Sequence, residues 1–265
     1  MRIRHSVTLS SVILSLLAAT SAIAQKATPT GEVFGYHEMR TLSGLGGGSY
    51  GADSEGYVSL SGPLAFSTPV ANTLGHNHFW IGGSQYSYKS YPVSNTSNSN
   101  SGYTATYGTT IARRVNLAAT ANFVDTHFTT LFDLQAQWIS APKEKFTYAV
   151  GVADLLDHTK SYNYAGQRVS SLSTFAVTTY RTHFGRYAAS LTAGTGMRRF
   201  APFFGSATIQ LARPLRLWSE EDRYGNVFGL TFASQLGHSH RAVPVTLSLG
   251  LAQTRYAVAQ AGIGF

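Results

Sequence analysis

The chain contains nine histidines, and the spacing of four of them could place two imidazoles on one face of a strand. His76 and His78 form one such pair, and His238 and His240 form another. In an extended chain, residues two positions apart lie about 7 Å from each other on the same face. A structural zinc site needs a full set of ligands at about 2 Å, and no cysteine or suitably spaced carboxylate completes either pair. We predict no metal site and no cofactor, although the sequence leaves open whether these histidines bind metal.

Two other pairs have the residue types of a general base. Asp125 precedes His127 by two positions, and Asp157 directly precedes His158. A carboxylate can orient and polarise an imidazole, which then activates a serine or a water molecule. However, no motif places a serine beside either pair, and adjacent residues on a strand point to opposite faces. We therefore predict no catalytic residues.

The elements that carry these residues are short alternating segments, which follow one another from about residue 78 onwards. In one segment, Phe132 and Trp138 share an apolar face while Asp133, Gln135 and Gln137 share the opposite, polar face. Ser/Asn/Gly runs, prolines or charged clusters separate the segments. The pattern predicts strands at 78–89, 102–112, 115–124, 129–139, 146–155, 171–180, 187–196, 202–211, 214–221, 226–234, 244–252 and 255–265.

These strands have the length and the alternation of a transmembrane barrel. A tilted strand needs about 9–11 residues to cross the hydrocarbon layer, with apolar side chains towards lipid and polar ones towards the lumen. A soluble β-sandwich alternates too, but charged residues make up only 12% of this chain, against about 25% in typical soluble proteins. We predict an all-β, antiparallel up-and-down barrel of about 12 strands. A count of roughly 10–14 stays open, because residues 25–77 could add a pair.

The N-terminus has the features of an exported protein. Arg2 and Arg4 precede a short apolar region, and Ala22 and Ala24 form a small-x-small cleavage pattern. We predict a signal peptide at 1–24, a Gly-rich periplasmic segment at 25–77 and an outer-membrane barrel at 78–265.

The last strand ends on Phe265, and its alternate residues are apolar. A terminal aromatic of this kind is a feature that the barrel-assembly machinery of the outer membrane reads, so we expect that machinery as a partner, together with outer-membrane lipids and lipopolysaccharide. Counting strands back from Phe265 places the long loops 90–101 and 156–170 outside the cell. The net charge of +8 would suggest nucleic acid in a soluble protein, but export argues against that partner.

Aromatic and charged residues near strand ends have expected positions in such a barrel. We expect Trp80, Trp138 and Trp218 in the aromatic girdles at the membrane interfaces. The acidic run Glu220–Asp222 is expected beside the headgroups at a strand end. The alternation places Asp133 and Arg216 on the lumen side, where they could form ion pairs or line a pore.

Short motifs in the mature chain resemble those of YjbH-like outer-membrane barrels, which are associated with exopolysaccharide production. Residues 28–33 (Thr-Pro-Thr-Gly-Glu-Val) resemble the opening of that family, with Gly where the family has Ala. Residues 148–156 resemble its central strand, an Ala-Val-Gly-Val run before an acidic residue. The motifs at 202–205, 214–222 and 226–230 follow in the family's order. The resemblance implies a barrel with an envelope role and supplies no catalytic residues.

These observations predict a passive channel or an envelope component linked to exopolysaccharide export, passing polysaccharide or small anionic solutes. Two alternatives remain: an outer-membrane hydrolase of lipid A or peptides, and a closed structural or adhesive barrel. Pore or plug, the solute and the oligomeric state are not encoded in the pattern.

Overall fold

The computed structural model describes most of the chain from Tyr50 to the C-terminus. The described residues are 50–86, 101–123, 130–139, 144–157, 161–162, 168–169, 172–222, 225–237, 243–252, 254 and 256–265. The expected signal peptide at 1–24 lies outside them, as do residues 25–49 of the expected periplasmic segment. None of the described residues forms a helix that is long and apolar enough to span a membrane.

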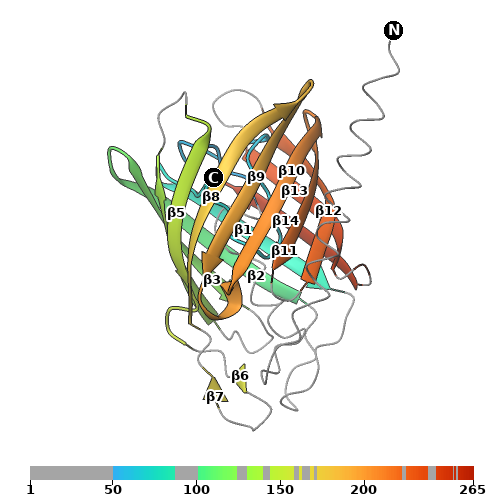
Figure 1. Ribbon diagram of the computed structural model, residues 1–265. Coiled ribbons are helices and arrows are strands. Elements are labelled where there is room, and N and C mark those ends of the chain that lie inside the picture. The colour runs from blue at the N-terminus through green and yellow to red at the C-terminus, as the bar shows by residue number, and fades with distance from the viewer. Residues whose placement is uncertain are drawn as a thin grey trace.

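Twelve antiparallel strands close into a barrel, as the alternation predicted (Figure 1). Their order around the wall is β1-β14-β13-β12-β11-β10-β9-β8-β5-β4-β3-β2. The strands are β1 (His78–Tyr86), β2 (Ser101–Ala112), β3 (Val115–Phe123), β4 (Thr130–Trp138), β5 (Phe146–Ala153), β8 (Ser173–Phe184), β9 (Tyr187–Gly196), β10 (Phe203–Ala212), β11 (Leu215–Asp222), β12 (Gly225–Leu236), β13 (Val243–Ala252) and β14 (Tyr256–Gly264). Two short strands, β6 (Ser161–Tyr162) and β7 (Arg168–Val169), pair outside the wall, and a 3-10 turn, η1 (Arg198–Phe200), precedes β10.

The first and last wall strands close the barrel. β1 pairs with β14 from Trp80 opposite Gly264 to Tyr86 opposite Val258. One further pair extends this ladder, because Phe79 and Phe265 exchange both backbone hydrogen bonds, at 3.0 and 2.8 Å. The C-terminal residue is therefore part of the seam.

Alternate residues of each wall strand face lipid and lumen. On β4, Asp133, Gln135 and Gln137 are buried inside, whereas Phe132 and Trp138 are exposed on the outside. The same division holds on β13, where Leu247 and Leu249 are exposed and their polar neighbours are buried. An inverted alternation of this kind, polar inside and apolar outside, confirms the predicted barrel class.

The two ends of the barrel differ. At one end, tight turns such as Arg113–Arg114, Gly185–Arg186 and Arg213–Pro214 join neighbouring strands, and Phe265 lies there too. We call this the short-turn end. At the opposite end, β1 ends at Tyr86, β2 begins at Ser101 and β5 ends at Ala153, and β6 and β7 lie on this side, at the bottom of Figure 1. We call this the long-loop end.

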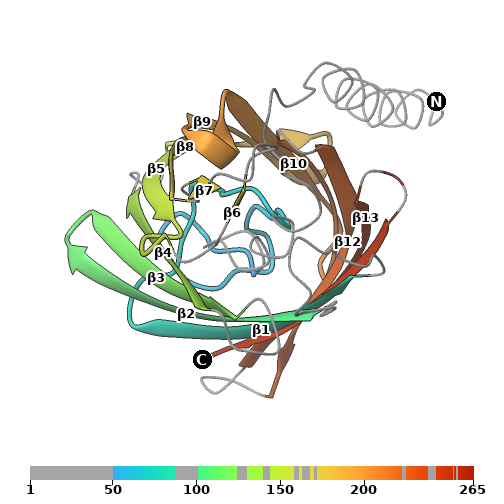
Figure 2. The same ribbon diagram turned by 90° about the horizontal axis from the view of Figure 1, so that it is seen from below.

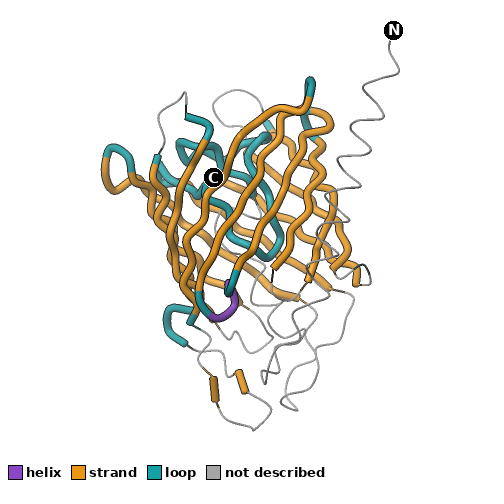
Figure 3. Tube along the Cα trace, in the orientation of Figure 1, coloured by secondary structure: helices purple, strands orange, loops and turns teal. Residues whose placement is uncertain are grey.

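Residues Tyr50–Asn77, which we call the inner segment, lie inside the barrel. Viewed along the barrel, the blue trace of this segment lies within the ring of strands (Figure 2). In the side view it forms a loop among the strands (Figure 3). The one backbone bridge found within it joins Ala52 and Val58, and the segment adds no strand to the wall.

Candidate functional site inside the barrel

The interior of the barrel is occupied by contacts between the wall and the inner segment. Lumen-facing polar residues of the wall that a wet pore would expose are instead buried. They include Thr104, Thr106, Asn116, Thr120, Asn122, Asp133, Gln135, Gln137, Thr147, Thr179, Thr192, Thr208, Arg216, Glu220, Thr231, Thr246, Ser248 and Gln260. The lumen is therefore the candidate functional site, and the inner segment is the element that lies within it.

Glu220 of β11 is the strongest single anchor of the inner segment. Its carboxylate accepts hydrogen bonds from the backbone N–H groups of Phe66, Ser67 and Thr68, at 2.9 to 3.0 Å. The hydroxyls of Ser67 and Thr68 donate to it as well, at 2.6 and 3.0 Å. A hydrogen bond to a charged group contributes about 1.5–3 kcal/mol net, so this cradle fixes the segment firmly.

Further wall residues bond to the backbone of the inner segment, among them Thr208, Thr179, Gln137 and Gln135. The hydroxyl of Thr208 accepts from Leu64 N–H at 2.9 Å and donates to Leu64 C=O at 3.0 Å. The remaining bonds are Ala71 N–H to Thr179 Oγ1 (3.0 Å), Thr73 N–H to Gln137 Oε1 (2.8 Å), Gln135 Nε2 to Val70 C=O (2.7 Å) and Gln137 Nε2 to Ser54 C=O (2.9 Å). The inner segment is buried without pairing as a strand, so its backbone N–H and C=O groups need other hydrogen-bond partners. Side chains of the wall provide them.

Apolar side chains of the inner segment also pack on aromatic residues of the wall. Leu64 and Phe66 pack with Trp218, and the Phe66 and Trp218 rings are parallel at 6.3 Å. Tyr50 packs with Trp80, with ring centroids 5.3 Å apart. Each fully buried large side chain stabilises by about 1.5–3 kcal/mol. The segment is therefore held by hydrophobic packing as well as by hydrogen bonds.

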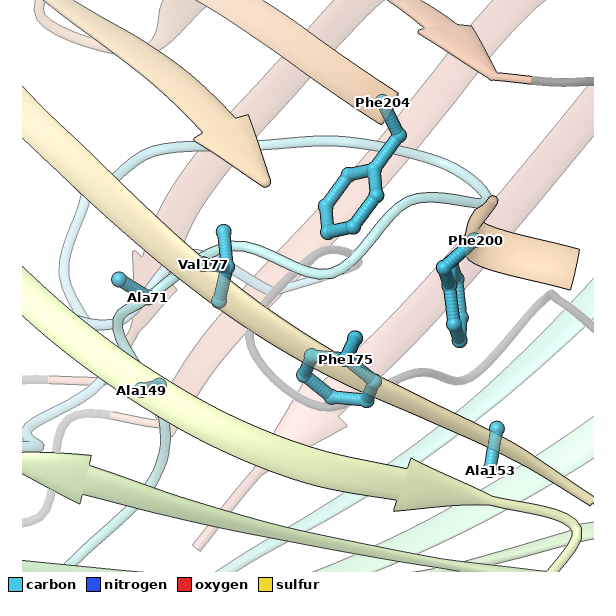
Figure 4. Close-up of a cluster of buried hydrophobic side chains, with 7 residues drawn as sticks. All are labelled: Ala71, Ala149, Ala153, Phe175, Val177, Phe200 and Phe204. Carbon is cyan, nitrogen blue, oxygen red and sulfur yellow. The ribbon is translucent and has the colours of Figure 1, made fainter. Parts of the chain in front are cut away.

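A third apolar cluster lies between η1 and the strands β5, β8 and β10 (Figure 4). Phe175, Phe200 and Phe204 contact one another in tilted or edge-on geometry, with centroids 5.0 to 6.5 Å apart. Ala71 of the inner segment belongs to the same cluster.

Glycines on neighbouring strands make room for these lumen aromatics. Gly151 lies opposite Phe175, Gly194 opposite Phe204 and Gly229 opposite Trp218 in the strand register. A Cβ added at any of the three would lie 2.1 to 2.7 Å from an atom of the facing ring. The rings therefore lie flat over the glycines, which is a recurring way of covering glycine in a sheet.

The backbone of the inner segment closely approaches the wall at Gly108 of β2. A Cβ added there would lie 2.3 Å from Leu74 Cβ and 2.4 Å from the Leu74 carbonyl. The absence of a side chain at Gly108 therefore leaves the space that Leu74 of the inner segment occupies.

The junction between the inner segment and β1 is conformationally unusual and tightly bonded. His76 and Asn77 both have positive φ, at 52° and 60°, which is uncommon for residues other than glycine. Asn77 Oδ1 accepts hydrogen bonds from Tyr107 OH and Thr109 Oγ1, both at 2.8 Å. The His76 ring stacks on Tyr57 at 4.2 Å. The short-turn end thus holds the junction in a strained but well-supported conformation.

His76 and His78, the one histidine pair among the described residues, both lie beside Tyr57 and bond to backbone carbonyls. His76 Nε2 lies 3.0 Å from the Glu55 carbonyl and His78 Nδ1 lies 3.1 Å from the Phe265 carbonyl. Within the described residues, no group of three or more His, Asp or Glu side chains is placed to hold a metal ion. His238, His240, Asp125, His127 and His158 lie outside the described residues.

Two of the expected girdle residues are wrong. Trp80 and Trp218 are only 1% and 2% exposed and point into the lumen, whereas Trp138 is 53% exposed on the outer face. Glu220 was expected beside the headgroups and instead binds the inner segment. Asp133 and Arg216 do face the lumen, as the alternation predicted.

The alternation along β11 carried a signal for the corrections of Trp218 and Glu220. Trp218 lies two residues from Arg216 and two from Glu220, so all three share a face, and a charged face is a lumen face. The placement of the inner segment had no comparable signal.

The closed twelve-stranded wall, with its apolar outside and polar inside, defines an outer-membrane β-barrel protein of the porin type of fold. The fold is similar to that of the KdgM porin in complex with disordered oligogalacturonate, with a TM-score of 0.50 and 7% identity over 71% of this chain and 98% of that chain. A second KdgM porin structure covers the same shares at a TM-score of 0.48 and 6% identity. The outer membrane protein Omp33 of Acinetobacter baumannii gives 0.42 and 11%, over 71% of this chain and 97% of that chain.

The first of these likenesses, at a TM-score of 0.50, supports a shared fold. No protein-family model matches the chain, and no curated protein matches it. The resemblance to YjbH-like barrels stays a prediction from sequence motifs.

Proposed function

We propose that the protein is a channel of the outer membrane whose passage is closed by its own inner segment. The observation that carries this proposal is that the segment fills the lumen without being part of the wall. The twelve strands close on one another through the β1–β14 seam, so the cylinder does not need the segment for closure. With the segment moved out, Thr, Asn, Gln and Ser side chains would line a wet passage.

The course of the inner segment supports withdrawal towards one side. At its start, Tyr50 packs on Trp80, whose strand partner Gly264 lies at the short-turn end. At its finish, His76 N–H bonds to Thr110 Oγ1, close to the turn between β2 and β3. Its middle reaches Glu220, deeper in the lumen. Both ends of the loop therefore lie at the short-turn end, which faces the periplasm in barrels of this class.

A reversible tether tests the proposal directly. The chain has no cysteine, so a double variant Ala71→Cys/Thr179→Cys would carry a single new disulfide between the inner segment and β8. We expect conductance steps in planar bilayers from the reduced protein and their loss on oxidation. The matched control is Ala71→Cys alone, which should conduct equally under both conditions. Equal conductance of the oxidised and reduced double variant would rule out gating by the segment.

A closed structural barrel is the second candidate, and the aromatic side chains buried in the otherwise polar lumen favour it. Trp80, Trp218 and Phe175 would face water if the inner segment left, which is unfavourable by several kcal/mol. On this alternative, neither the reduced tether variant nor the wild type conducts. A variant lacking residues 51–74 would then lose the heat-modifiable band of a folded barrel in gel electrophoresis.

The solute that we propose for the channel is polysaccharide or a small anionic solute, passing without catalysis. The sequence resemblance to YjbH-like barrels supports export of exopolysaccharide, and the solved KdgM complex contains an acidic oligosaccharide. Liposome swelling with neutral and acidic oligosaccharides, using the reduced tether variant, tests this choice. Equal exclusion of both kinds of sugar, while small ions pass, would contradict it.

A further inference from the structure

Arg216 is a fully buried cation at the interface between the wall and the inner segment. It is the second residue of β11, it faces the lumen and it is 1% exposed. Its neighbours across the strands are Gln210 of β10 and Thr231 of β12. The side chain therefore lies near the short-turn end, beneath the inner segment.

Within the part of the chain that the structure describes, only the Nη1 nitrogen of the Arg216 guanidinium has hydrogen-bond acceptors. Nη1 donates to the carbonyl of Gly62 at 2.9 Å and, more weakly, to the carbonyl of Ser59 at 3.5 Å. Nε and Nη2 are buried and bond to no atom of the described residues. The inner segment thus fixes the plane of the guanidinium and leaves one of its edges unused.

Two lumen carboxylates of the described wall, those of Glu220 and Asp133, have partners other than this charge. Glu220 lies on the same face four residues along the strand, about 13 Å away, and its oxygens accept from Phe66, Ser67 and Thr68. On β4, Asp133 accepts from Asn122 Nδ2 at 2.6 Å and from Asp154 N–H at 2.8 Å. Burying an ion without a counter-charge is strongly unfavourable, so the site calls for an anion from solution.

We propose that the Nε–Nη2 edge of Arg216 binds a small oxyanion, a carboxylate or a phosphate, which locks the inner segment to the wall. Two parallel N–H groups on one edge match the two oxygens of such an ion. Gly51 supports the assignment from the segment side. It has φ +70°, and a Cβ there would lie 2.5 Å from Arg216 Nη1, so only glycine keeps the segment this close to the guanidinium. The inference does not depend on whether the barrel conducts.

Binding can be measured on the full chain in detergent. Equilibrium dialysis with labelled inorganic phosphate should find about one ion per wild-type chain, competed by acetate and not by equal ionic strength of chloride. Arg216→Lys keeps the charge but has no paired donors, and we expect at least a tenfold loss of phosphate affinity. Arg186→Lys, at an exposed turn, is the matched control and should bind as the wild type does. Competition by acetate as strong as by phosphate itself would identify a carboxylate site; weak competition would identify a phosphate site.

Thermal unfolding provides the second readout. Because the ion binds only the folded protein, saturating phosphate should raise the wild-type unfolding temperature by roughly 5 °C relative to chloride, and should raise that of Arg216→Lys by less than half as much. Absence of phosphate and acetate binding to the wild type would overturn the proposal, whatever the variant does. Wild-type-like binding by Arg216→Lys would overturn it too.

Discussion

Glu220 and Ser67 are joined twice, because the Glu220 carboxylate accepts from both the backbone N–H and the hydroxyl of Ser67. Every hydrogen bond between the inner segment and this carboxylate has the carboxylate as acceptor. The wall residue is therefore matched to the segment in chemical type as well as in position.

Replacing the carboxylate with an amide should release the middle of the inner segment. In Glu220→Gln, an NH₂ group would face N–H and O–H donors, which leaves buried donors without acceptors. We expect a loss of about 2–4 kcal/mol from the free energy of unfolding and faster hydrogen exchange at residues 66–68. The control is Glu221→Gln on the opposite face of the same strand. Slow exchange at 66–68 in Glu220→Gln would show that the cradle is not needed.

A side chain at Gly108 should displace the end of the inner segment. The methyl groups of Gly108→Val would occupy the position of Leu74, whose backbone cannot shift without breaking its neighbours' bonds. We expect about 1–3 kcal/mol of destabilisation in urea titrations of the detergent-solubilised barrel. Gly83→Val on β1 is the control, because the nearest atom to an added Cβ there is 3.5 Å away. Similar losses in both variants would argue against a specific fit.

The three tryptophans should respond differently to lipid. Trp138 faces the membrane, whereas Trp80 and Trp218 face the lumen. In variants that keep one tryptophan each, with Phe at the other two positions, brominated lipids should quench Trp138 fluorescence strongly and the other two weakly. Strong quenching of the Trp218-only protein would contradict the lumen placement.

The terminal phenylalanine should matter more for assembly in the cell than for stability. The Phe265 side chain is 58% exposed, and its backbone bonds to Phe79 do not require the ring. We expect Phe265→Ala to change the unfolding free energy by less than about 0.5 kcal/mol but to reduce the folded protein in outer-membrane fractions severalfold. Phe203→Ala, at a more exposed lipid-facing phenylalanine, is the control. Equal membrane levels of Phe265→Ala and wild type would remove the proposed role of Phe265 in assembly.

The wall of this barrel could be predicted from sequence because a two-residue period is visible locally. The alternation of Phe132 with Asp133 and Gln135 already indicates which face of the strand is in contact with lipid. The inner segment could not be placed this way. Its anchors join residues far apart in the chain, such as Ser67 with Glu220 and Leu64 with Thr208, and they bind backbone atoms that every sequence has. A loop that contains Gly and Ser can lie in solvent or in a lumen, so its composition does not predict which of the two it occupies.

The girdle prediction failed for a different reason. It used the residue type of Trp218 and its nearness to a strand end, but not its parity with Arg216. Residues two positions apart on a strand share a face, so the charged neighbours of Trp218 indicate that it faces the lumen. This signal outweighs the general preference of tryptophan for membrane interfaces.

Both ends of the inner segment lie at the short-turn end. A pulling force from that side would therefore break the contacts between the segment and the wall one after another. The force needed is then set by the single strongest attachment, the Glu220 cradle, and not by the sum of all of them. A push from the long-loop end would instead spread the load over many contacts at once. We therefore expect the inner segment to leave the lumen under a smaller force when it is pulled from the short-turn end than when it is pushed from the long-loop end.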